Sequence, residues 1–489
     1  MKVWLGLASG IVFVYVYGLV VLYLLGYDHR DVLRRPYLIF CYGSGSISLF
    51  MFTSALFKVS MGLKSNVVSL LVLFFFAVAR WFGKGKGERG WSLFSNWPQK
   101  VKSHMGRRQK VLYLMLILLI VFEISYLSSR SLLEPETSFD GRVRWGLCAK
   151  VLYAEGGIYT DYFDNPKHYY NLPFNPLLVP LQMASIYYAM GEMHARLVKV
   201  LFLVYFVMLM AAFYDVARRY VSVLGASLFT AFLATIPPYF YGEGSASTCM
   251  VDVPLAFFCF VCVVMLFSCL KQKKSGPVIP VAMVLFFCAF AKSEGVYYAL
   301  IVMFCWFIAS LFDKDVHRAG LLKGAGSMGL LFILLYMPWV IFRMTYIQLD
   351  HPNVPDAVTM GYVISKAHRL AFIIPRLIEE CFVVYRWHVI WMVFVVSLVC
   401  VSKKEFHDKG IVFLLTTIFG FFSFWTLTYM LSAWWGRLDD GACMQLMDVT
   451  LFRLYLHLIP VVLLCTVVCL SRSNSGKTGH VLEQLAGGV

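Results

Sequence analysis

The sequence predicts an all-α polytopic membrane protein with about 13 transmembrane helices. Of its 489 residues, 60% are hydrophobic and only 14% are charged, whereas soluble domains carry roughly a quarter charged residues. Apolar runs of about 20 residues, long enough to cross a bilayer as a helix, recur along the chain. The alternating pattern of an outer-membrane barrel is absent.

The first apolar run, residues 1–25, is predicted to be a span. It is too long for the hydrophobic region of a signal peptide, and no Ala-x-Ala-like cleavage site follows it. Most of the 13 cysteines lie inside apolar runs, where a thiol acts as a small hydrophobic group. The predicted spans are about 3–25, 37–57, 66–82, 111–128, 196–217, 221–240, 252–270, 277–291, 296–312, 324–343, 387–402, 410–433 and 450–470.

The distribution of basic residues predicts how these spans are oriented across the membrane. The segment between the third and fourth spans holds eight Lys or Arg residues and one acid, Glu88, so it is expected in the cytoplasm. Alternation then places every other short basic segment on the same side, with the N-terminus outside and the C-terminus in the cytoplasm. The net charge of +16 therefore reflects membrane topology, and no nucleic-acid partner is expected.

The opposite face receives longer segments with mixed charge, at 129–195, 241–251, 344–386 and 434–449. Long segments of this kind are often functional, so 129–195 is expected to form one wall of an active site. Within 344–386, apolar residues recur at helical spacing over about 358–382, which predicts a helix along the outer membrane surface. Residues 142–153 repeat the pattern on a smaller scale.

Two acids on the predicted outer face are candidate catalytic groups. Asp140 follows the fourth span by about a dozen residues and opens the amphipathic segment 142–155, and Asp252 lies at the outer edge of a span that is apolar after it. An acid at the depth of Asp252 tends to face a cavity or a partner. Both acids also suit the cap of a helix N-terminus, so either role is open for each.

Three further charged residues lie near the same predicted face. Lys292 and Glu294 sit in a turn between two apolar runs, where Lys292 is expected either to extend to the interface or to bind an anionic headgroup. Arg453 lies a few residues into the last span, and it could bind a phosphate or pair with Asp448. The outer histidines have no metal-ligand spacing, and a divalent metal requirement stays open.

Several motifs occur in an order that resembles the GT-C membrane glycosyltransferases, in the branch of the protein O-mannosyltransferases and the lipid A aminoarabinose transferase. They are FDGRVRWGLCAKVLYAEG, YYNLPFNPLLVPL, VDVPLAFF, AKSEG and TLFRLYLHLIP. The likeness covers about residues 111–470 and implies a GT-C-like core whose long first outer loop is catalytic and contains juxtamembrane helices. Residues 1–110, with three extra spans and a basic loop, have no counterpart, and 471–489 form a predicted cytoplasmic tail.

The resemblance implies that Asp140 and Asp252 serve at the catalytic centre. The segment around Asn175 departs from the family pattern, because it lacks the cation that some members use toward the lipid phosphate. Lys167, Lys292 and Arg453 are candidates to replace that cation. The full set of expected substrate-binding residues is Arg144, Lys167, Tyr170, Asn175, Lys292, Glu294 and Arg453.

The expected function is transfer of a sugar from a polyprenyl-phosphate donor to a glycan, lipid or protein acceptor at the periplasmic or lumenal side. A carboxylate can take the proton of the acceptor hydroxyl, and a cation can stabilise the departing phosphate. The aromatic residues of 129–195, including Tyr170, would stack on a sugar or form an interfacial belt. A bacterial inner membrane is favoured over the endoplasmic reticulum. A polytopic transporter or lipid flippase is the alternative.

Overall fold

The computed structural model describes residues 1–83, 105–272, 278–312, 318–347, 359–402, 405–432 and 437–486. Regular structure in these ranges is helical, without a β-strand. Ten helices are long and apolar enough to cross a membrane. The prediction of an all-α, multi-pass membrane protein is therefore confirmed at this level.

All thirteen predicted apolar runs form helices, but they differ in length. The ten of spanning length are α1 (Lys2–Leu24), α3 (Pro36–Leu56), α4 (Leu63–Gly83), α5 (Arg107–Leu133), α9 (Val200–Ala217), α11 (Asp252–Gln272), α13 (Ser293–Leu311), α14 (Arg318–Phe342), α19 (Lys409–Leu431) and α20 (Asp440–Ala486). The other three are shorter: α10 (Val223–Ala234), α12 (Val278–Ala291) and α18 (Ile390–Val399). A count of thirteen spans thus stays a prediction.

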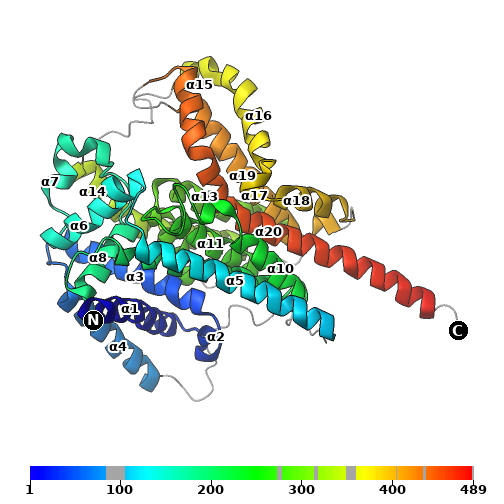
Figure 1. Ribbon diagram of the computed structural model, residues 1–489, viewed down its shortest axis with the longest axis horizontal. Helices are drawn as coiled ribbons and strands as arrows, with labels where there is room; N and C mark the ends of the chain where they lie inside the picture. Colours follow the sequence, from blue (N-terminus) through cyan, green and yellow to red (C-terminus); the bar gives the residue numbers. More distant parts are fainter. Residues whose placement is uncertain are drawn as a thin grey trace.

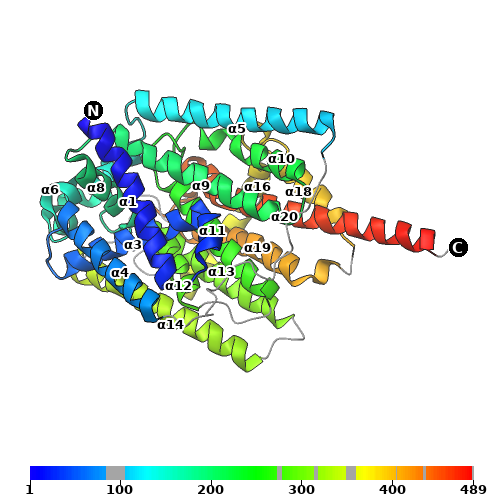
Figure 2. The same cartoon turned by 90° about the horizontal axis from the view of Figure 1, so that it is seen from below.

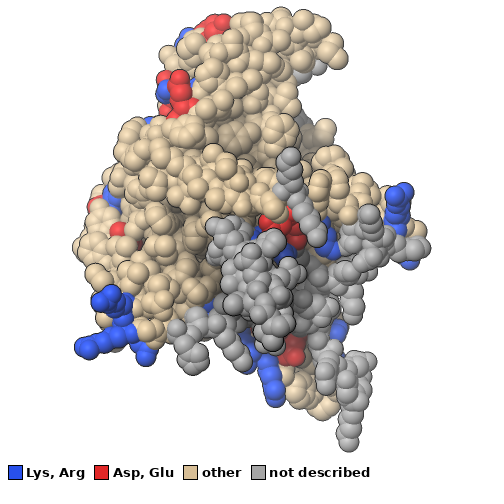
Figure 3. All heavy atoms as spheres, turned by 90° about the vertical axis from the view of Figure 1, so that its right-hand side faces the viewer, with Lys and Arg blue, Asp and Glu red and all other residues tan. Residues whose placement is uncertain are grey.

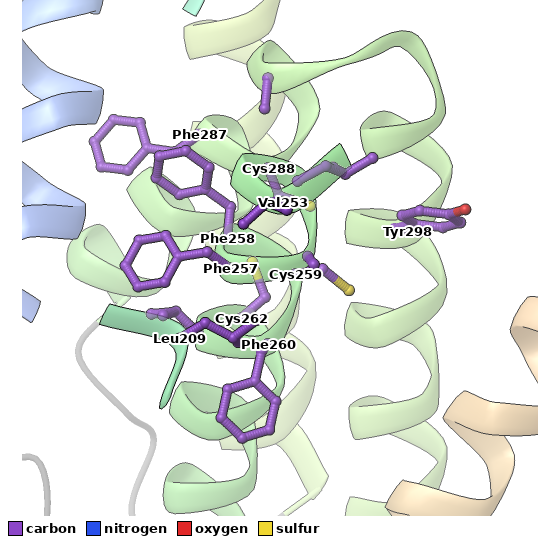
Figure 4. Close-up of a cluster of buried hydrophobic side chains, with 14 of the residues drawn as sticks. Leu209, Val253, Phe257, Phe258, Cys259, Phe260, Cys262, Phe287, Cys288 and Tyr298 are labelled. Atoms are coloured by element: carbon purple, nitrogen blue, oxygen red, sulfur yellow. The ribbon is translucent and has the colours of Figure 1, made fainter. Parts of the chain in front are cut away.

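The bundle is built around α11 (Figures 1 and 2). This helix is apolar on all sides, a pattern typical of a helix surrounded by protein, and its whole spanning window is buried. It packs against α9, α12, α13 and α20. Phe257 and Phe258 of α11 lie among buried side chains that include Phe287 of α12 and Tyr298 of α13 (Figure 4).

The first helices belong to the same bundle. α1 and α3 cross closely, because a Cβ atom on Gly18 would lie 1.9 Å from the carbonyl oxygen of Ile39, and one on Gly43 would lie 2.0 Å from that of Val14. Small residues allow this kind of approach between apolar helices. Both helices also pack against α8 (Leu178–Met190), and α3 contacts α9, α11 and α12.

Segment 129–195 contains the expected short helices, namely η1 (Gly141–Trp145), α6 (Gly146–Glu155), α7 (Asp161–Asp164) and η2 (Pro166–Asn171). Residues 178–190 of this segment form the helix α8, which the sequence did not predict and which is almost entirely buried against α1, α3 and α6. The outer position of the segment stays a prediction. This helix is apolar on every side and has only thirteen residues. A length criterion for spans therefore passes over it.

The amphipathic pattern near 358–382 correctly predicted helical structure, although residues 348–358 lie outside the described ranges. The helix is broken into α15 (Met360–Lys366), η6 (Ala367–Arg369) and α16 (Leu370–Cys381). Arg369 is fully buried and donates to the carbonyl oxygens of Met430 and Ser432 and to the carboxylate of Asp440. These bonds hold the segment against α19 and α20, so it is more than a surface helix.

The remaining short elements connect the longer helices. They are α2 (His29–Leu33), η3 (Leu197–Lys199), η4 (Pro237–Tyr239), η5 (Arg343–Ile347), α17 (Val384–Trp387) and η7 (Glu405–His407). α20 bends between its first part, beside α15 and α19, and the part that projects toward the C-terminus (Figure 1). Pro460 explains a bend, since it cannot donate to the carbonyl of Leu456. That carbonyl accepts instead from the Tyr239 hydroxyl at 2.9 Å.

One end of the bundle is basic. There the Arg35 guanidinium lies 3.3 Å from Asp215 at the end of α9, and Arg472 of α20 lies 2.9 Å from Asp408 at the start of α19. α5 begins with Arg107, whose side chain is exposed. Figure 3 looks onto this face, where Lys and Arg side chains gather at several places. Many of the basic residues that predict a common side, including those of 84–102, lie outside the described ranges, so the orientation of the termini stays a prediction.

Candidate functional site

Four charged side chains from distant parts of the chain meet at the opposite end of the bundle. We call Asp140, Asp252, Lys292 and Arg453 the charge cluster. Arg453 lies at its centre, with Nη2 3.0 Å from Asp252 Oδ2 and Nη1 3.2 Å from Asp140 Oδ2. Lys292 Nζ lies 3.0 Å from Asp252 Oδ1. All four residues are buried, and the most exposed of them are 8% exposed.

Asp252 is completely buried at the first residue of α11. Helix packing brings three hydrogen-bond donors to its two oxygens and a fourth nitrogen nearby. Oδ1 faces Lys292 Nζ and lies 3.4 Å from His457 Nε2, while Oδ2 accepts from Nε and Nη2 of Arg453 at 3.2 and 3.0 Å. A buried acid without such partners would be strongly disfavoured. The Asp252 carboxylate therefore pairs with two cationic side chains at once. Because it lies in the first turn of α11, the helix dipole also stabilises its negative charge.

Asp140 directly precedes η1 but forms no capping hydrogen bond there. The cap interpretation of this residue is therefore wrong. Its Oδ1 instead lies 2.6 Å from Nη1 of Arg144, one turn later, and its Oδ2 lies 3.2 Å from Arg453. Burial lowers the pKa of Arg144, and the negative charge of Asp140 opposes this shift. Asp140 thus lies between two guanidinium groups.

Lys292 is a single extended residue between α12 and α13. The expectation that it extends to the interface is wrong, because its ammonium turns inward to Asp252 and also lies 3.1 Å from Glu294 Oε1. Burial would lower the pKa of Lys292, but the carboxylates of Asp252 and Glu294 raise it above its usual range. The ammonium is therefore charged at neutral pH.

The close α12–α13 turn that holds Lys292 depends on Gly295. A Cβ atom here would lie 1.9 Å from the backbone oxygen of Cys288. We expect Gly295→Ala to separate the two helices and to lower the free energy of unfolding by about 1–3 kcal/mol, the usual cost of overpacking. Denaturant titration of the purified protein in detergent measures this loss.

Gly326→Ala in α14 is the matched control, because no atom lies within 4 Å of the position that a Cβ would take there. Alanine at this site should leave stability unchanged or raise it by up to about 1 kcal/mol through helix propensity. Equal unfolding curves for the two variants would contradict the role assigned to Gly295.

Two residues that the sequence did not single out lie next to the charge cluster, one near Arg453 and one near Asp252. Glu243 lies between Gly242 and Gly244, which both adopt positive φ, and its Oε2 is 3.9 Å from Arg453 Nη1. His457 is fully buried, one helical turn after Arg453. The i,i+4 spacing from Arg453 indicates that His457 lies on the same face of the helix, so the sequence alone could have identified it as a neighbour of the site.

Arg453 does not pair with Asp448, the partner considered from the sequence. Asp448 lies 3.1 Å from Arg376 of α16, and both side chains of that pair are more than half exposed. A residue five positions away on a helix does not share the face of Arg453. The cluster is therefore formed between helices and not within α20.

Asn175 lies beside the cluster, with its Oδ1 accepting from the Ser293 hydroxyl at 3.0 Å. It also lines a cavity of about 10 Å³ together with Arg144, Trp145, Cys148, Tyr162, Asn171, Leu172, Pro173, Leu177 and Pro180. That volume is roughly the space of one water molecule. The cavity has aromatic, amide and guanidinium groups, but in this conformation it is too small for a sugar.

Lys167 and Tyr170 do not join the cluster. Lys167 is exposed on η2 and forms no hydrogen bond or ion pair with the cluster within the described ranges. Tyr170 is 67% exposed, and its ring lies 5.8 Å from that of Tyr169. Of the predicted set, the structure thus brings together Asp140, Arg144, Asn175, Asp252, Lys292, Glu294 and Arg453.

Among the described residues, no group of three or more His, Cys, Asp or Glu side chains is arranged to hold a metal ion. The cluster instead combines carboxylates with guanidinium and ammonium groups. These cations are the groups that bind phosphate, and Arg can do so with two parallel hydrogen bonds. Comparisons with protein-family models, curated proteins and solved structures found no match.

Proposed function

We propose that this protein is an integral-membrane glycosyltransferase with a GT-C-like fold. It moves a sugar from a polyprenyl-phosphate donor to an acceptor hydroxyl on a glycan, lipid or protein. The observation that supports this proposal is the bridge of Arg453 between Asp140 and Asp252, with Lys292 on the same carboxylate. The reaction needs a group that accepts a proton and a cation that stabilises the departing phosphate, and the charge cluster contains both.

The reaction has two chemical requirements. The acceptor oxygen must lose a proton as it bonds to the anomeric carbon, and a carboxylate within hydrogen-bond reach can take it. The bond from that carbon to the phosphate oxygen breaks, and the departing lipid phosphate gains charge. Lys292, Arg453 and Arg144 can stabilise that charge, as preorganised donors do in other transfer enzymes.

The donor must also open the site. The cluster is almost fully buried and the neighbouring cavity has room for about one water. A phosphate would replace part of the ion pairing between Arg453 or Arg144 and Asp140, which frees carboxylate oxygen for the acceptor. Binding and opening are therefore coupled in this proposal.

The proposed location is the outer face of a bacterial inner membrane, with the N-terminus outside and the C-terminus in the cytoplasm. Support comes from the basic end of the bundle, which the positive-inside rule assigns to the cytoplasm. α5 begins at that end with Arg107 and ends at Leu133, shortly before Asp140. A lipid-linked donor would thus meet the cluster at the outer leaflet.

A transporter or lipid flippase is the competing proposal. Transporters place their ion and substrate sites near the middle of the membrane, between repeats with broken helices. Here Asp252 is the first residue of α11, and Lys292 precedes α13. This position at helix ends favours an enzyme acting at the membrane surface.

The direct test is incubation of the purified protein in lipid nanodiscs with a panel of polyprenyl-phosphate sugars that carry a radiolabel in the sugar. We expect release of free polyprenyl phosphate and a labelled acceptor. Lys167→Ala is the control for loss of a cation outside the cluster, and it should retain wild-type turnover.

Reconstitution in sealed vesicles separates the two proposals. Movement of intact donor between leaflets, with no cleavage of the sugar–phosphate bond for any member of the panel, would refute the enzyme and support the flippase.

A further inference from the structure

Asp252 and Asp140 differ in how many hydrogen-bond positions remain free. An ionised carboxylate offers about four lone-pair sites. Asp252 accepts three hydrogen bonds, from Lys292 Nζ, Arg453 Nε and Arg453 Nη2. Asp140 accepts one from Arg453, and Arg144 Nη1 forms an ion pair with it at 2.6 Å. His457 Nε2 lies 3.4 Å from Asp252 Oδ1 without forming a hydrogen bond, so the character of this contact depends on which nitrogen of His457 carries the proton.

Neighbouring side chains determine that proton position. The indole of Trp425 can only donate, and its Nε1 lies 3.0 Å from the Tyr298 hydroxyl oxygen. The Tyr298 hydroxyl lies 3.2 Å from His457 Nδ1. Both Tyr298 and Trp425 are fully buried, and no other acceptor for the hydroxyl proton lies within hydrogen-bond distance in the described part of the chain.

The direction of this chain of hydrogen bonds follows. Trp425 donates to Tyr298, and Tyr298 donates to Nδ1 of His457, which must then be unprotonated. A proton on Nδ1 would leave the buried Tyr298 hydroxyl without an acceptor, which is unfavourable. The imidazole is therefore neutral with its proton on Nε2, which lies 3.4 Å from Asp252 Oδ1 but outside hydrogen-bond geometry. The charged groups around the ring are Asp252, Lys292 and Glu294.

We propose that His457 and Asp252 are positioning residues: His457, held as the Nε2–H tautomer by Tyr298, presents its N–H side to Asp252, and Asp252 anchors Lys292 and Arg453 through three hydrogen bonds and takes no substrate proton. This inference deepens the proposed function, because it assigns the proton-accepting role to Asp140 alone. In that reaction the proton passes from the acceptor hydroxyl to Asp140 as the glycosidic bond forms.

The tautomer can be measured without any substrate. Two-bond ¹H–¹⁵N correlation spectra of ¹⁵N-histidine-labelled protein distinguish the Nε2–H tautomer, the Nδ1–H tautomer and imidazolium. The chain has 11 histidines, and His457→Gln identifies the signal that belongs to His457. We expect the Nε2–H pattern at neutral pH, and its loss in Tyr298→Phe, which keeps the ring but removes the donor.

An Nδ1–H or imidazolium pattern in the wild-type protein would overturn the proposal. So would an unchanged pattern in Tyr298→Phe, since the hydroxyl would then not fix the tautomer. The NMR measurement requires no catalysis, so it tests the proposed role of His457 independently of the glycosyltransferase assignment.

Stability and donor affinity give a second readout for the anchor role. Asp252→Asn places an amide opposite two cations, so its melting temperature should fall well below that of Asp140→Asn. Asp140→Asn should lower kcat with little change in KM, whereas Asp252→Asn, if folded, should raise KM as the cations lose their place. The reverse order in either measurement would overturn the assignment.

Discussion

Replacing Asp140 with Asn is expected to slow sugar transfer by about 10²–10⁴-fold, the usual contribution of a general base. Asn keeps the volume of the side chain and one acceptor oxygen, but it cannot take a proton. The measurement is the release of polyprenyl phosphate under single-turnover conditions, with the donor that the wild-type protein uses.

The fold of Asp140→Asn should survive, since the carboxylate accepts one hydrogen bond, from Arg453, forms one further ion pair, with Arg144, and lies outside the spanning helices. Asp161→Asn is a suitable control, because Asp161 is an exposed acid of the same segment. Turnover by Asp140→Asn at the rate of Asp161→Asn would exclude Asp140 as the base.

Replacing Arg453 with Met is expected to destabilise the protein by about 3–5 kcal/mol, because it leaves a buried charge without its partner. Arg453 supplies three hydrogen bonds to Asp140 and Asp252, and Asp252 is completely buried. Met has a similar length and no charge, so the effect reports lost pairing more than lost volume. Reversible denaturant titration in detergent micelles measures the change.

Arg376→Met is the matched comparison for Arg453→Met. Arg376 likewise forms an ion pair that holds a neighbouring helix to α20, here α16 through Asp448 at 3.1 Å, but its side chain is 51% exposed. Exposed pairs contribute about 0–1 kcal/mol. Similar losses of unfolding free energy in the two variants would show that burial does not strengthen the Arg453 ion pairs. That result would contradict the role assigned to the charge cluster.

The sequence predicted the helices and the candidate acids from composition and position. Asp252 is identified because it lies where a polar segment meets an apolar run, a boundary that is visible in one dimension. Asp140 is identified from its place before the amphipathic segment 142–155 and from the family resemblance. Their meeting on Arg453 depends on how α11 and α20 pack, which periodicity does not encode. The same holds for Lys292, whose inward direction results from the tight turn at Gly295.

Each wrong or missing assignment from the sequence has a specific structural explanation. Asp448 seemed a partner for Arg453 because it is near in sequence, but it faces α16. Lys167 was a cation in a promising segment, and only the three-dimensional position shows it exposed. α8 was missed because it is short, although its burial makes it part of the core. His457 could have been found from its spacing to Arg453.

The packing of α1 and α3 has a consequence for biosynthesis. Ser48 of α3 donates to the carbonyl of Leu178 at the start of α8, and Gln182 of α8 is buried with its side chain against Tyr205 of α9. Ribosomes deliver α1 and α3 to the bilayer more than a hundred residues before α8 is made. The first two helices must therefore persist as a pair in lipid, joined through Gly18 and Gly43, until the later segment arrives to complete their contacts.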